Sequence, residues 1–339
     1  MIMKIKMVHI GSIILLCSLF ALCCNKSPVT PDLQETGNLK TPATEGTVWA
    51  ASSAPFIGET LGGVESWQRL NNRLKAANGG FGMMGRRSYD KGIPATFAAS
   101  AMAEDVGNCP VSIGSFKPDW TETVNGSNNE AIKKFIQSIP DDRVVYLVFY
   151  HEPEDNVNSR NTSDVLLQAF ARFVNMVLTS GKTNIHPCFV LMTWTFKPQS
   201  GRNPEDFNMG KYLKPEQLSK VVAGLDGYAD DPSVSAQQIF EANVNRMKTW
   251  GFTRFGIFET GAHASPTDAS ARSKWVEGLG QWVKSRNDIE LVSWFNNGNG
   301  QHAGPTGWYL GNWYKNGTTY SWDDADGTIA AFAQLLKQN

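Results

Sequence analysis

From residue 48 onward, short apolar runs alternate with longer stretches in which apolar residues recur every three or four positions. The short runs are rich in β-branched and aromatic residues and most end near Pro or Gly, which predicts buried strands, whereas the longer stretches predict amphipathic helices. The strands are expected at 55–60, 80–84, 110–116, 144–150, 188–195, 221–228, 254–258 and 290–295. The helices are expected at 64–74, 128–138, 163–178, 236–250, 269–285 and 327–336.

This alternation predicts an α/β fold in which right-handed crossovers close eight parallel strands into a (β/α)8 TIM barrel, a single catalytic domain over 48–339. A doubly wound open sheet is the alternative, but no Gly-x-Gly-x-x-Gly follows the first expected strand. Several long connections come after strands, at 117–127, 151–162, 197–220 and 296–326. In such a barrel they would all lie on the face that carries the cleft.

Residues 1–22 are expected to form a signal peptide, because Lys4 and Lys6 precede an apolar stretch too short to span a bilayer. The stretch ends in Leu22-Cys23-Cys24, which resembles the lipobox of bacterial lipoproteins. That resemblance implies lipidation at Cys23, with Cys24 as the alternative, and attachment to the outer membrane or cell surface after export. A plain secretory signal is the other interpretation. Residues 23–47, rich in Pro and Thr, predict a flexible tether.

Charge and cysteine content exclude several classes of protein. The chain has 31 Lys and Arg against 32 Asp and Glu, which disfavours binding to nucleic acid. No Cys/His cluster has the spacing of a zinc site, so we expect no metal or cofactor. Cys109 and Cys188 would lie at the bottom of the barrel, either as a disulfide or as buried free thiols. We expect a monomer.

Two glutamates stand at strand ends about a hundred residues apart. Glu152 follows the run at 144–150 and Glu259 follows the run at 254–258, which are strands four and seven of the expected barrel. Those strands lie on roughly opposite sides, so the carboxylates can face each other across the mouth. Two carboxyl groups about 5–5.5 Å apart are the equipment of a retaining glycosidase. Glu259 would be the nucleophile and Glu152 the acid/base, its pKa raised by the charge on Glu259.

An acid/base Glu after strand four and a nucleophile Glu after strand seven resemble glycoside hydrolase clan A. His151 precedes Glu152, where most families of that clan have Asn, and this pair is similar to family 26, the family of β-mannanases with some β-1,3-xylanases and mixed-linkage glucanases. The resemblance implies that Tyr228 hydrogen-bonds the nucleophile and that Trp294 floors the −1 sugar subsite. His151 would orient groups in that subsite. Lys117 stands where the family has a substrate-binding His, which is a departure.

Further candidates for sugar binding are Trp194, Trp120 and Lys117, each of which could equally be a core or surface residue. His263, four residues after Glu259, could reach the cleft. Glu154 and Asp155 are interpreted as solvated loop acids rather than a cation site, because no matching ligand set is visible.

Together these features predict a lipid-anchored, retaining endo-β-glycosidase that cleaves a β-linked polysaccharide, with mannan as the first choice. A β-1,3-xylanase or mixed-linkage β-glucanase of the same family is the alternative, as is a non-catalytic lipoprotein that binds surface glycans. The expected partner is a polysaccharide or oligosaccharide. An esterase is disfavoured because no Gly-x-Ser-x-Gly elbow is present.

Overall fold

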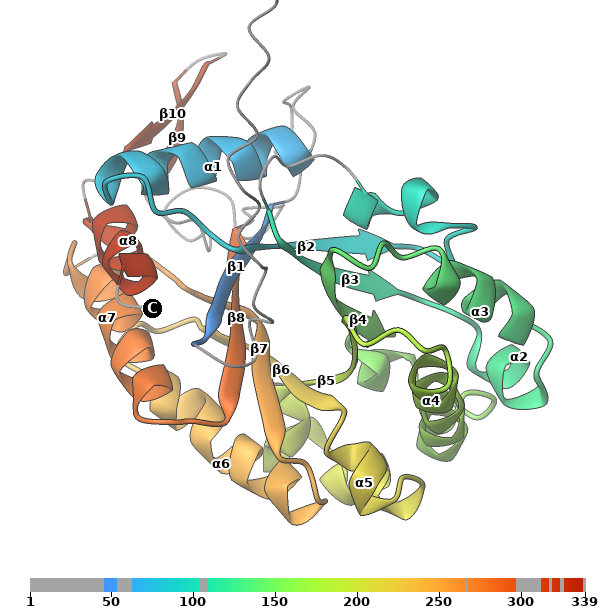
Figure 1. Ribbon diagram of the computed structural model, residues 1–339. Coiled ribbons are helices and arrows are strands. Elements are labelled where there is room, and N and C mark those ends of the chain that lie inside the picture. Colours follow the sequence, from blue (N-terminus) through green and yellow to red (C-terminus); the bar gives the residue numbers. More distant parts are fainter. Residues whose placement is uncertain are drawn as a thin grey trace, which may run out of the picture. The chain divides into compact units, whose positions relative to one another are not determined.

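The computed structural model describes residues 46–53, 63–103, 109–265, 267–296, 312–316, 319–323 and 326–337, which all belong to one unit, Lys40–Asn339. Eight parallel strands pair in chain order, and the first pairs with the last, so the sheet is a closed barrel (Figure 1). The expected (β/α)8 fold is confirmed. The strands are β1 (Val48–Ser53), β2 (Gly85–Asp90), β3 (Val111–Phe116), β4 (Val144–Phe149), β5 (Ile185–Met192), β6 (Val222–Ala229), β7 (Arg254–Ala262) and β8 (Ile289–Asn296).

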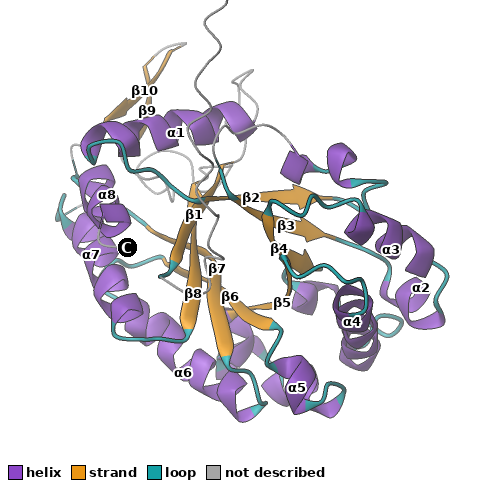
Figure 2. Cartoon of the chain, in the orientation of Figure 1, coloured by secondary structure: helices purple, strands orange, loops and turns teal. Residues whose placement is uncertain are grey.

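Helices surround the strands (Figure 2). Thr162 caps the longest of them, because its hydroxyl accepts a hydrogen bond from the backbone N–H of Val165. The sequence did not predict the antiparallel pair β9 (Asn312–Asn316) and β10 (Thr319–Asp323), which lies in the connection after β8. The helices are α1 (Gly63–Ala77), α2 (Trp120–Asn125), α3 (Asn129–Gln137), α4 (Ser163–Leu178), α5 (Pro215–Leu218), α6 (Ala236–Thr249), α7 (Ala271–Lys284) and α8 (Thr328–Lys337).

Successive residues of each strand face opposite sides of the barrel wall, and this alternation divides the core in two. On β8, Leu291 packs inside the barrel with side chains such as Tyr146 and Phe258. Its neighbours Val292 and Trp294 belong to the layer between the strands and the helices. The alternation therefore decides which strand-end residues can reach the cleft.

The first two strands were wrongly predicted. β1 lies at Val48–Ser53 and not at 55–60, a range that lies outside the described residues. Its small residues, Ala50 and Ala51, fit the crowded barrel but give a weak strand pattern. β2 lies at Gly85–Asp90 and not at 80–84. The sequence there, Gly-Arg-Arg-Ser-Tyr-Asp, is polar yet largely buried, because its side chains have partners inside the protein.

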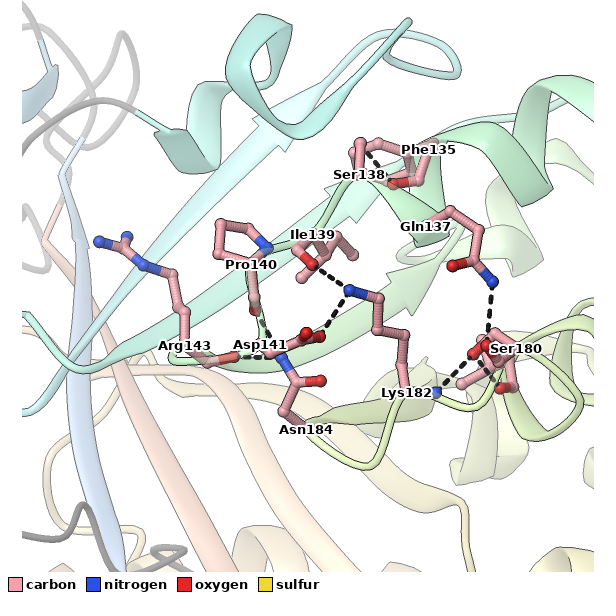
Figure 3. A network of polar contacts seen from close by, with 11 residues as sticks. Phe135, Gln137, Ser138, Ile139, Pro140, Asp141, Arg143, Ser180, Lys182 and Asn184 are labelled. Atoms are coloured by element: carbon pink, nitrogen blue, oxygen red, sulfur yellow. Dashed lines mark hydrogen bonds and ion pairs between the residues drawn. The ribbon is translucent and has the colours of Figure 1, made fainter.

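At the bottom of the barrel, polar contacts fix the start of β4 (Figure 3). Lys182 donates to the carbonyl of Ile139 at 2.8 Å and to Asp141 at 2.5 Å. Asn184 donates to the carbonyls of Pro140 and Arg143, each at 2.7 Å, and its own carbonyl accepts from Val145 at 2.9 Å. These contacts join the α3–β4 and α4–β5 connections and anchor the strand whose other end leads to Glu152.

Cys109 and Cys188, whose pairing the sequence left open, are both free and buried. Burial raises the pKa of the Cys109 thiol to about 11. Residues 1–45, which include the expected signal peptide and Cys23, lie outside the described residues. Within the described part of the chain, no helix is both long and apolar enough to cross a bilayer.

Candidate active site

Three carboxyl groups converge at the C-terminal ends of the strands. Glu152 follows β4, Asp226 lies on β6 and Glu259 lies on β7. One oxygen of each carboxyl group lies within 4.8 Å of the corresponding oxygens of the other two. The structure therefore brings together the two glutamates that the sequence paired, and it adds an aspartate that the sequence did not suggest.

The backbone after β4 takes an unusual path. Tyr150 and Glu152 have φ values of 60° and 48°, in the left-handed region that non-glycine residues rarely adopt. Such residues cost about 1–3 kcal/mol each and tend to mark functional sites. Pro153 then starts a short 3-10 helix, Pro153–Asn156. This turn ends the strand abruptly and leaves Glu152 beside Glu259 at the barrel mouth.

Two hydrogen bonds and an ion pair hold the carboxylate of Glu259. The hydroxyl of Tyr89 donates to Oε1 at 2.7 Å, and the guanidinium of Arg87 lies 3.1 Å from the same oxygen. The hydroxyl of Tyr228 donates to Oε2. The contact from Tyr228 is the one implied by the family resemblance. Because both oxygens are bound from different strands, the orientation of this carboxylate is fixed.

Glu152 has the electrostatic environment of a general acid. Burial raises its pKa to about 7, and the negative charge of Glu259 adds to the effect, while Arg87 and Lys117 oppose it. The sequence attributed this raised pKa to Glu259 alone, whereas burial is the larger cause. A carboxyl group with a pKa near neutrality can hold a proton at the start of a reaction and take one back later.

Arg87 and Tyr89 are site residues that the sequence analysis missed. Arg87 is fully buried and joins two carboxyl groups, with Asp226 at 3.2 Å and Glu259 at 3.1 Å. Burial by itself would lower its pKa, but Tyr89, Asp226 and Glu259 hold that pKa above its usual value. The misplaced second strand hid both residues. Arg87 and Tyr89 stand two positions apart within a polar run, which is the spacing of residues on one face of a strand. That spacing was the signal that could have found them.

His151 lies against Tyr89, with ring centroids 5.1 Å apart. Its Nδ1 atom is buried and has no hydrogen-bond partner among the described residues. Burial and then the charges of Arg87 and Lys117 lower its pKa to about 2, so the imidazole is neutral. A neutral imidazole with a free ring nitrogen can bind a sugar hydroxyl.

A cleft of about 300 Å³ opens beside the carboxyl groups. Trp194 lies in its wall with 45% of its surface exposed, and the ammonium group of Lys197 lies 5.7 Å from the indole centroid. The cleft is lined by Glu152, Met192, Thr193, Trp194, Lys197, Asp226, Gly227, Tyr228 and Asp230. Of the tryptophans named as candidates, Trp194 is the one that presents an accessible face to this cleft.

The structure does not place Trp294 or Trp120 in the cleft. Trp294 is fully buried between the barrel and its helices, where it packs edge-on against Trp275 of α7 and Phe332 of α8. The strand alternation explains this position, because successive residues face opposite sides of the barrel wall. The ring of the next residue, Phe295, has its centroid 5.8 Å from that of the Tyr228 ring. Trp120 is 1% exposed and packs against Tyr150.

Lys117 lies near the cluster, with its ammonium group 5.0 Å from the Tyr150 ring. Its charge acts on both Glu152 and His151. His263 follows β7, and its backbone N–H donates to the carbonyl of Ala229. Lys117 therefore lies near Glu152, and His263 lies directly after the end of β7.

The expectation of solvated acids after Glu152 is wrong for one of the two residues. Glu154 is 3% exposed, and its Oε1 accepts hydrogen bonds from the N–H of Met192 at 2.7 Å and from Thr195 at 2.8 Å. Burial raises its pKa to about 7. Asp155 is exposed and pairs with Arg202 at 2.6 Å. Glu154 thus ties the loop after β4 to the end of β5.

Glu152, Asp226 and Glu259 also have the spacing of a cation site. The guanidinium of Arg87, however, already supplies positive charge to two of the three carboxyl groups. The cluster is therefore better explained as a proton-handling site than as a metal centre.

No protein-family model and no curated protein matches the sequence. The structure is similar to a glucosidase from Croceicoccus marinus, with a TM-score of 0.55 and 10% identity over 86% of this chain and 66% of that longer chain. It is also similar to fungal β-1,4-galactanases, with a TM-score of 0.54 and 12% identity over 85% of this chain and 98% of the other. A GH5 family lichenase from Caldicellulosiruptor sp. F32 gives a TM-score of 0.50 and 12% identity over 87% and 94% of the two chains.

At these identities the comparisons establish a shared barrel fold. All three similar structures are named as glycoside-cleaving enzymes. The resemblance of the strand-end residues to family 26 stays a prediction, since likeness of fold does not select a family within such barrels.

Proposed function

We propose that the chain is a retaining endo-β-glycosidase that hydrolyses a β-linked polysaccharide, with Glu259 as nucleophile and Glu152 as acid/base. One observation carries this proposal: oxygens of the two carboxyl groups lie within 4.8 Å of each other at the C-terminal face of the barrel. Retaining enzymes place the two groups about 5–5.5 Å apart, whereas inverting enzymes leave about 6.5–9.5 Å for a water molecule.

In the first half of the reaction, an oxygen of Glu259 attacks the anomeric carbon, and Glu152 gives its proton to the departing glycosidic oxygen. The product is a glycosyl ester on Glu259. Water then attacks the same carbon, Glu152 takes a proton from that water, and Glu259 leaves as a carboxylate. Formation of the ester removes the negative charge of Glu259, so the pKa of Glu152 falls when it must act as a base.

For the substrate we propose β-mannan first, on the resemblance of His151-Glu152 and Tyr228 to family 26, with β-1,3-xylan and mixed-linkage glucan as alternatives. The exposed indole of Trp194 offers a flat surface on which a pyranose ring can stack. A non-catalytic glycan-binding protein remains the rival of a different class. The ordered nucleophile and the acid with a raised pKa favour an enzyme.

The test is product analysis with the full-length chain on mannan, xylan, β-1,3-xylan and mixed-linkage glucan. We expect oligosaccharides of several lengths from one of them, with the β configuration retained in the first product seen by NMR. Glu259→Gln should bind the same polymer without cleaving it. Binding by the unaltered chain without any release of sugar would support the glycan-binding rival instead.

We also propose that the protein is a bacterial lipoprotein anchored to the cell envelope through Cys23. The proposal rests on the residues before Cys23 and on the tether-like composition of 23–47. Cys23→Ala should move the protein from the detergent phase to the aqueous phase in a partition assay, while Cys24→Ala should not. The reverse result would assign the lipid to Cys24.

A further inference from the structure

Asp226 is a carboxyl group for which the two-glutamate mechanism has no use. It lies on β6 with its side chain fully buried. Its Oδ1 accepts a hydrogen bond from Arg87 at 3.2 Å, while its Oδ2 has no partner among the described residues. One of its oxygens lies within 4.8 Å of oxygens of both Glu152 and Glu259.

The charges around Asp226 do not balance if every group is ionised. Arg87 and Tyr89 face it from β2, Glu152 from the end of β4, Glu259 from β7 and Tyr228 from its own strand. Arg87 is the one cation that contacts Asp226 in the described part of the chain, and it also serves Glu259. If all were ionised, the three carboxylates of Asp226, Glu152 and Glu259 would therefore lie within 4.8 Å of one another with a single guanidinium in contact with two of them.

The surroundings of Arg87 increase the cost of an additional charge. Its guanidinium carbon lies 5.6 Å from the Phe258 ring and 5.1 Å from the Tyr89 ring, so an aromatic layer covers it. Burial raises the pKa of Asp226 well above its usual value. The charge and hydrogen bond of Arg87 oppose this rise, whereas the negative charges of Glu259 and Glu152 add to it. A carboxyl group in such a place is stabilised in its neutral form.

We propose that Asp226 is a positioning residue that stays a neutral carboxylic acid next to the catalytic pair, Glu152 and Glu259. Because the protonated Asp226 carries no charge, the positive charge of Arg87 is available to the nucleophile Glu259. This inference rests on the proposed function. The resting site then holds protons on Glu152 and Asp226, and the charge of Glu259 is balanced by Arg87.

Asp226→Asn tests the proposal, because an amide reproduces a neutral carboxyl group and can still accept from Arg87. We expect the alkaline limb of the kcat/KM profile of Asp226→Asn to lie at the same pH as in the unaltered enzyme. If Asp226 were ionised, removing its charge would lower the pKa of Glu152 and move that limb down by a unit or more. Such a shift would overturn the proposal.

Asp230→Asn is the matched control, since Asp230 is an exposed carboxyl group in the same cleft wall. Infrared spectra of protein carrying ¹³C-labelled aspartate give a readout that does not depend on turnover. We expect a protonated-carboxyl band at neutral pH that disappears in Asp226→Asn and persists in Asp230→Asn. The same band in both variants would overturn the proposal. If the unaltered chain cleaves no polysaccharide, the proposed function fails, while the infrared result still decides the state of Asp226.

Discussion

Tyr89 of β2 donates its hydroxyl to Glu259 of β7 at 2.7 Å, although the two residues are 170 positions apart in the sequence. The same carboxylate receives the Tyr228 hydroxyl on its other oxygen. The candidate nucleophile is therefore positioned from both sides by phenol groups, one of which the family resemblance did not foresee.

Tyr89→Phe should lower kcat/KM by about tenfold to a hundredfold, because a hydrogen bond to a charged group contributes about 1.5–3 kcal/mol. Steady-state kinetics on the best polymer would measure this effect. Tyr228→Phe removes the hydrogen bond to the other oxygen of Glu259, and we expect a loss of similar size. Unchanged kinetics in Tyr89→Phe would show that its bond to Glu259 has no part in turnover.

Glu259→Ala should reduce turnover by roughly 10⁴-fold while the protein stays folded. Circular dichroism and thermal melts would check the fold, and sugar release would check the activity. Ordinary activity in this variant would remove the nucleophile assignment.

Glu152→Ala should slow substrates with poor leaving groups most, since those need protonation of the departing oxygen. A series of aryl glycosides with different leaving-group pKa values would measure the dependence. Equal slowing across the series would contradict the role of Glu152 as the acid. In the unaltered enzyme, kcat/KM should fall above about pH 7, because Glu152 must be protonated and its pKa is about 7.

Glu154→Gln should make thermal stability less sensitive to pH. The pKa of Glu154 is raised to about 7 in the folded protein from a usual 4.5, so its neutral form favours folding below pH 4.5 and this contribution is lost as the pH rises through 7. The variant should gain about 3 kcal/mol relative to the unaltered protein between pH 4 and pH 9. Melting curves across this range would measure the gain, and Asp155→Asn, at an exposed site, should show none.

Alanine variants of the two tryptophans should distinguish a role in core packing, expected for Trp294, from a role in substrate binding, expected for Trp194. Removing the buried indole of Trp294 should cost about 3–5 kcal/mol of unfolding free energy. Removing the exposed indole of Trp194 should raise KM several-fold with little change in stability. Chemical denaturation and steady-state kinetics on both variants would measure the two effects. A rise in KM without loss of stability in Trp294→Ala would contradict the position seen for its ring.

The sequence predicts the barrel well where strands are apolar. The runs that become β4 and β7 were found within a few residues of their observed ends, and the glutamates that follow them meet as expected. β2 could not be found in this way, because the buried Arg87 and the half-buried Tyr89 have partners on β6 and β7 that hydropathy does not reveal. Trp294 was misplaced for another reason. Moving by one residue along a strand changes the side of the barrel wall that a side chain faces, and a short motif does not specify that side.

The contacts of Lys182 and Asn184 anchor β4 at the end of the barrel remote from Glu152. The location of Glu152 therefore depends in part on bonds at the opposite end of the barrel. Segments around the mouth, such as the one bearing Trp194 and Lys197, can change in length or composition while the reacting groups keep their places. Under the proposed function, the choice of sugar can evolve in such a barrel without rebuilding the chemistry.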